Sequence, residues 1–94
     1  MSVTRIRPRT QPTTELQVLK NRYDEARDIK DAWHYRLKEA QRAHSNAIRT
    51  GQDHEATRRN ITAVEINFND AAAQHKTALT AWMDATLHLE RNAA

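Results

Sequence analysis

The 94-residue sequence contains no cysteine, one glycine and two prolines. Without cysteine the chain has neither a disulfide scaffold nor a thiolate metal site. One glycine and two prolines are too few for the turns of an all-β fold or for the repeated crossovers of an α/β fold. Leu, Ile, Val and Phe together make only 15 residues, so large core side chains are also scarce. We therefore expect an all-α protein built from long helices.

Long apolar runs are absent as well. No stretch approaches the roughly 20 apolar residues of a membrane-spanning helix, and the first residues lack the apolar core of a cleaved signal peptide. We expect no membrane span and a cytoplasmic or virion-associated location. Secretion without a signal peptide stays open.

Glycine and proline divide the chain into three parts. Residues 1–14 hold both prolines, three arginines and no acid, which is typical of an extended arm. Residues 15–50 and 54–92 contain neither glycine nor proline, and the one glycine lies in the short segment 51–53 between them. The sequence thus predicts an extended basic N-terminal arm followed by two helices, which form one helical hairpin over residues 15–94.

Residues with known capping preferences stand at the ends of these helices. Either Thr13 or Thr14 suits the N-cap of the first helix, and Asp53 suits the N-cap of the second. Gly51 suits the left-handed position just after the first helix. These residues favour the same helix boundaries as the distribution of glycine and proline.

Both helical segments carry a row of mainly apolar residues at alternating spacings of three and four, the heptad a and d pattern of a coiled-coil seam. Lys30 and His75 interrupt the rows. We interpret Lys30 as a side chain that reaches solvent and His75 as a partly solvated residue that fixes the register. The two seams are Leu16, Leu19, Tyr23, Ala26, Lys30, Trp33, Leu37, Ala40, His44 and Ala47, and Ile61, Val64, Phe68, Ala71, His75, Ala78, Trp82, Ala85 and Leu89.

The short loop forces the two helices to pack antiparallel. Facing residues then have numbers that sum to about 101, so Tyr23 lies opposite Ala78 and Trp33 contacts Phe68. Several of these layers place a large side chain against a small one, as close packing requires. The sequence therefore predicts an antiparallel two-helix coiled-coil hairpin.

The second helix carries a further apolar face opposite its seam. Between residues 60 and 83 only Glu65, Asp70 and Lys76 are charged, whereas the outward positions of the first helix are mostly charged. Because a hairpin with one buried stripe is marginally stable alone, we expect this face to bind a second copy, giving a four-helix bundle, or a different protein. Scattered surface apolar residues are the alternative. The candidate partner-binding residues are Ile66, Ala73, Leu79, Thr80, Met83 and Leu87.

The net charge of +3 comes from the arm. Residues 15–50 carry +2 and residues 51–94 carry −2, so the hairpin is neutral. Arg5, Arg7 and Arg9 alternate with uncharged residues, so in an extended chain their guanidinium groups lie on one side. Such a strip could contact an acidic protein groove, a nucleic-acid backbone or anionic lipid, or it could be a solvated tail.

The sequence has no pattern typical of catalysis or metal binding. It lacks a Gly-rich phosphate loop and a nucleophile beside a base, so we expect no enzyme, no catalytic residue and no small-molecule substrate. His44 and His54 flank the loop and could approach one another. Two Asp–His pairs with helical ligand spacing lie outside the seams, so we expect no metal and no cofactor. These pairs are Asp31 with His34 and Asp84 with His88.

We expect a non-catalytic protein–protein interaction module, such as an adaptor, an inhibitor or a structural virion component. A phage genome is one source that would encode such a protein. The first alternative is a small nucleic-acid-binding helical dimer, similar in outline to the plasmid copy-number regulators that fold as four-helix RNA-binding bundles. The basic residues that would bind nucleic acid have acidic neighbours on the first helix, so ion pairs on the surface of that helix are favoured instead. The basic residues concerned are Lys20, Arg22, Arg27 and Arg36.

The second alternative rests on a resemblance. At the loop the sequence reads Arg49-Thr50-Gly51, and no Tyr-x-x-x-Asp/Glu pattern follows the second helix. In length and helix-loop-helix layout the chain resembles the Trp-x-Gly family exported by type VII secretion, although arginine replaces the tryptophan. The resemblance implies a secreted hairpin that pairs into a four-helix bundle.

Overall fold

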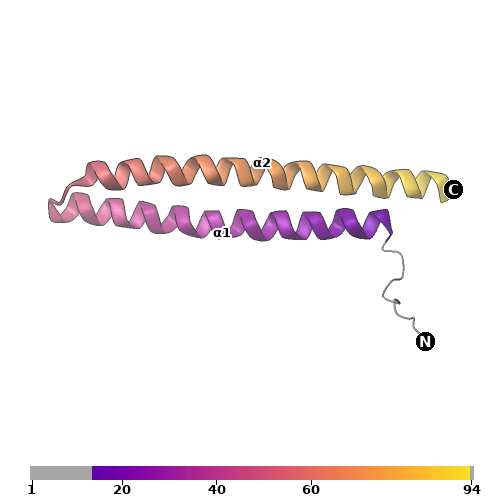
Figure 1. Ribbon diagram of the computed structural model, residues 1–94, viewed down its shortest axis with the longest axis horizontal. Coiled ribbons are helices and arrows are strands. Elements are labelled where there is room, and N and C mark those ends of the chain that lie inside the picture. The colour runs from indigo at the N-terminus through magenta and orange to yellow at the C-terminus, as the bar shows by residue number, and fades with distance from the viewer. Residues whose placement is uncertain (1–13, 94) are drawn as a thin grey trace, which may run out of the picture.

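The computed structural model describes residues 14–93, and in this range it contains two long helices and no strand. α1 spans Glu15–Thr50 and α2 spans His54–Ala93, so about 95 % of the described residues are helical. The helices lie side by side and antiparallel, joined by one short loop (Figure 1). The expected all-α hairpin is confirmed, and the observed bounds differ from the expected ones by one residue, at the end of α2. The expected arm lies outside the described residues except for Thr14.

A side-chain oxygen caps the first turn of each helix. Thr14 has extended backbone angles, and its Oγ1 accepts a hydrogen bond of 3.0 Å from the backbone N–H of Gln17. Asp53 Oδ1 accepts one of 3.0 Å from the backbone N–H of Glu55. Because the first N–H groups of a helix have no partner within the helix, these caps fix where α1 and α2 begin.

The turn between the helices depends on Gly51, whose φ of +75° lies in the left-handed region. The backbone N–H groups of Gly51 and Gln52 donate to the carbonyls of Ile48 at 3.3 Å and Ala47 at 2.9 Å. This pattern satisfies carbonyls in the last turn of α1, and glycine adopts it without steric cost. The capping roles expected for Thr14, Gly51 and Asp53 are confirmed.

The faces that α1 and α2 turn toward each other contain the expected seams. All ten seam residues of α1 and eight of the nine in α2 are at least partly buried. Among these seam residues, the buried side chains are the short ones of Ala40, Ala47, Val64 and Ala71. No large side chain among residues 14–93 is fully buried. The hairpin is therefore held by one narrow apolar strip.

Contacts across the strip follow an antiparallel order. The Tyr23 ring lies between His75 and Trp82, with ring centroids 5.0 and 5.2 Å away. These two residues flank Ala78, the expected partner of Tyr23. At the other end, His44 and Thr57, whose numbers sum to 101, are joined by a side-chain hydrogen bond of 2.9 Å.

Leu89 is the one seam residue that the structure leaves exposed. Its expected burial is wrong, because its facing position would be residue 12, which precedes the start of α1 at Glu15. α2 therefore extends past the helical part of its neighbour. The expected contact of Trp33 with Phe68 stays a prediction; the ring that lies beside Phe68, at 5.6 Å, is that of His34.

Candidate protein-binding site

The exposed apolar side chains of α2 lie together on one side of the helix. Ile66, Met83 and Leu87 are 65 %, 52 % and 51 % exposed. At 3.6 residues per turn these three residues fall within an arc of about 100°. Ala73 and Thr80 are exposed on the same arc. We call Ile66, Ala73, Thr80, Met83 and Leu87 the outer face of α2.

Five of the six residues expected to bind a partner thus share one exposed surface. The sixth, Leu79, is only partly exposed, because it lies at the edge between the outer face and the seam. The three arm residues expected to contact an anionic partner lie outside the described residues. They are Arg5, Arg7 and Arg9.

A hollow of about 380 Å³ adjoins the outer face where α2 meets α1. Small side chains line it, among them Ala78 and Ala81 and, on the outer face, Ala73. A second hollow of about 280 Å³ includes Met83 and Leu87 in its wall. Both are open depressions of the kind that side chains of a partner protein fill. The first hollow is completed by Leu19, Arg22, Gln74 and Thr77.

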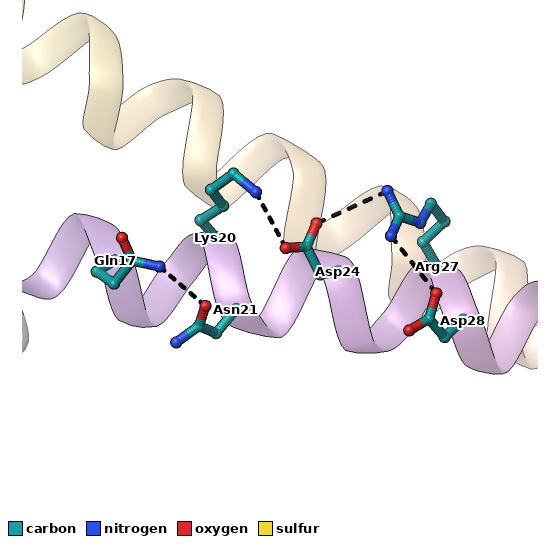
Figure 2. Close-up of polar contacts among 6 residues, drawn as sticks. All are labelled: Gln17, Lys20, Asn21, Asp24, Arg27 and Asp28. Atoms are coloured by element: carbon teal, nitrogen blue, oxygen red, sulfur yellow. Dashed lines mark hydrogen bonds and ion pairs between the residues drawn. The ribbon is translucent and has the colours of Figure 1, made fainter.

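The outward side of α1 is charged instead. Figure 2 shows Lys20 and Arg27 on either side of Asp24, at 3.0 and 3.8 Å, and Arg27 also reaches Asp28 at 3.5 Å. Of the ion pairs that join a lysine or an arginine to a carboxylate within residues 14–93, four lie on α1 and one lies on α2. Exposed pairs of this kind contribute little stability, about 0–1 kcal/mol each, but they keep this side of the hairpin hydrated.

The basic residues of the nucleic-acid alternative are engaged within the hairpin. Besides its ion pair, Lys20 lies over the Trp82 ring with Nζ 5.6 Å from the centroid. Arg36 lies over the Trp33 ring at 4.8 Å. Arg22 lines the hollow beside Ala73. The structure therefore does not gather these side chains into one free basic patch.

Sequence analysis missed two exposed apolar residues on α1, Ile29 and Ile48. They are 49 % and 56 % exposed, and Tyr35 is 65 % exposed. The three residues point to different sides of α1, about 100° or more apart. They do not form a second face, although each is as exposed as the residues of the outer face of α2.

Two histidines meet at the loop end of the hairpin. His44 on α1 and His54 at the start of α2 have ring centroids 5.9 Å apart at a steep angle. Thr57 Oγ1 lies 2.9 Å from His44 Nδ1 and donates to the backbone carbonyl of His54 at 2.9 Å. Within residues 14–93 no three or more His, Asp or Glu side chains converge.

No helix within residues 14–93 has the length and apolar character needed to cross a membrane. Comparison of the chain with protein-family models, curated proteins and solved structures found no match.

Proposed function

We propose that this protein is a non-catalytic interaction module, a helical hairpin that binds another protein through the outer face of α2. The observation that carries the proposal is that Ile66, Met83 and Leu87, each more than half exposed, lie on one arc of α2. Fully burying a side chain of this size stabilises an association by roughly 1.5–3 kcal/mol, so covering the exposed halves of three is a substantial driving force. The partner is a second copy of the chain or a different protein.

We further propose that α1 and α2 pair as an antiparallel coiled coil. The unbroken three-four spacing of both seams and the placement of Tyr23 between His75 and Trp82 support this packing. Helices paired in this way present the residues of the outer face in a fixed order along one side of the hairpin.

The basic arm would make a second contact with the partner. Arg5, Arg7 and Arg9 precede α1 in the sequence. They would pair with carboxylates or phosphates at the margin of the same complex. An adaptor, an inhibitor or a structural component of a virion uses contacts of this type, in the cytoplasm or within a virion, and none needs a catalytic residue.

The nucleic-acid alternative has less support, because Lys20 and Arg27 are paired with acids on the same helix and the hairpin as a whole is neutral. No observation favours it over protein binding.

The test compares two double variants that change equally exposed apolar residues to glutamate. Met83→Glu with Leu87→Glu alters α2, and Ile29→Glu with Tyr35→Glu is the matched control on α1. Tagged intact protein is used to capture proteins from its source, including untagged copies of itself, with helicity followed by circular dichroism. We expect the α2 variant to lose its bound protein at unchanged helicity and the control to retain it. Loss in both variants, or in neither, would show that the outer face is not the binding surface.

A further inference from the structure

We propose that His44 and His54 form a binding site for one divalent transition-metal ion, such as Zn²⁺, Ni²⁺ or Cu²⁺, which links α1 to α2 across the loop. The site lies at the loop end of the hairpin, and it is independent of the outer face of α2.

The hydrogen bonds around Thr57 define which nitrogen of His44 carries the proton. The hydroxyl of Thr57 has one proton, and the carbonyl of His54, 2.9 Å from Oγ1, can only accept it. If the hydroxyl donated to His44 instead, two oxygens would face each other at 2.9 Å with no proton between them. The hydroxyl therefore donates to the carbonyl and accepts from His44 Nδ1–H, also at 2.9 Å.

A neutral His44 with the proton on Nδ1 has its lone pair on Nε2, which is the form that binds metal ions. Histidine ligands in metal sites usually donate their other ring N–H to an oxygen acceptor, which fixes the orientation of the ring. Thr57 Oγ1 supplies that acceptor here. His44 as a whole is half-buried, so part of the residue is exposed to solvent.

The second ligand lies within reach. Two imidazoles on one tetrahedral ion, with metal–nitrogen bonds of about 2.0–2.1 Å, have ring centroids about 5 Å apart. The His44 and His54 rings are 5.9 Å apart. His54 is exposed at the first position of α2, so rotation of its side chain can close the difference without moving a helix. The two rings thus combine one oriented ligand with one adjustable ligand.

Imidazole nitrogen favours zinc, copper and nickel over magnesium and calcium, which prefer oxygen ligands. Because the hairpin holds His44 and His54 close together, an ion held by both binds the folded hairpin more tightly than the unfolded chain. Ion binding must therefore raise the stability of the hairpin by mass action.

The experiment is a thermal-unfolding series with ZnCl₂ or NiCl₂ added to the intact protein, with MgCl₂ as the ion control. We expect Zn²⁺ and Ni²⁺ to raise the melting temperature at submillimolar concentration, and Mg²⁺ to leave it unchanged. His54→Ala should abolish the rise without unfolding the protein, because this side chain is exposed. His34→Ala and His88→Ala are matched controls that should keep it.

Thr57 provides a finer test. Thr57→Val removes the acceptor for His44 Nδ1–H and should weaken ion binding about 10- to 100-fold, as loss of an outer-shell partner does. Thr57→Ser keeps the hydroxyl, so this variant should bind the ion as tightly as the wild type. Equal rises in melting temperature for the wild type and His54→Ala, or no rise in the wild type, would overturn the site. Either result would leave the role of the outer face of α2 untouched.

Discussion

α1 and α2 use the same seam spacing but have different outer sides. Within residues 14–93, α1 has four ion pairs between a lysine or arginine and a carboxylate, and its exposed Ile29, Tyr35 and Ile48 point in different directions. α2 has one such ion pair and places Ile66 and Leu87 on a single arc. The two helices expose similar numbers of large apolar side chains, so the number of such side chains does not mark a binding surface. The proposed binding surface rests instead on their arrangement, because side chains on one arc of a helix can be covered by one partner.

The largest expected effect separates the inner and outer sides of α2. Val64 is buried in the seam, whereas Ile66, two residues later, is 65 % exposed. Val64→Asp places an unpaired charge in the strip and should cost about 3–5 kcal/mol, enough to unfold a hairpin of marginal stability. Ile66→Asp should cost less than about 1 kcal/mol. Thermal unfolding followed by circular dichroism measures both. If both variants lost the same stability, the outer face would belong to the core of the hairpin.

A smaller effect, on binding alone, is expected from the arm. Deleting residues 1–12 should leave helicity and melting temperature unchanged, because the Thr14 cap and both helices remain. Three exposed ion pairs contribute roughly 1–2 kcal/mol together, so affinity for the captured partner should fall about tenfold. The salt dependence of that affinity should flatten. Replacing Arg5, Arg7 and Arg9 by lysine should restore only part of the affinity if the contacts are bidentate. Unchanged affinity and salt dependence after the deletion would identify a solvated tail.

The smallest effect is expected on the charged side of α1. Asp24→Asn removes the carboxylate between Lys20 and Arg27 and should change the free energy of unfolding by less than about 1 kcal/mol, because the side chains are solvated. Partner binding should not change. If Asp24→Asn lowered the free energy of unfolding as much as Val64→Asp in the same assay, the charged side chains of α1 would be essential to the stability of the hairpin. That result would contradict the prediction.

Most of the fold could be predicted from local patterns. The positions of Thr14, Gly51 and Asp53 define the helix ends, and the three-four spacing identifies the residues that become buried. Leu89 shows the limit of this reasoning, since a seam position is buried only where a facing helix exists. Ile29 and Ile48 show another limit: they flank the seam, and whether a flanking residue is covered depends on the size of the side chain across the interface. Periodicity along one helix does not contain that information.

The candidate sites were predictable to different degrees. The outer face of α2 could be found from sequence because its members share one helix and one spacing. Ligand spacing within one helix, in contrast, led only to Asp–His pairs outside the seams. The meeting of His44 and His54 joins two helices, so it depends on the exact turn at Gly51, and the role of Thr57 depends on a hydrogen bond that spans that turn.

The turn at Gly51 also determines the order in which the two helices pair during folding. Contacts next to the turn, such as the one between His44 and Thr57, 13 residues apart, close a short loop, whereas the contact of Tyr23 with Trp82 closes almost the whole hairpin. Short loops cost less entropy and form first, so we expect the helices to pair from the turn toward the open end and to separate in the reverse order. The outer face of α2 includes Met83 and Leu87, near the end that pairs last. A partner bound there would hold together the least protected part of the hairpin, so amide hydrogen exchange in that part should slow when the partner binds.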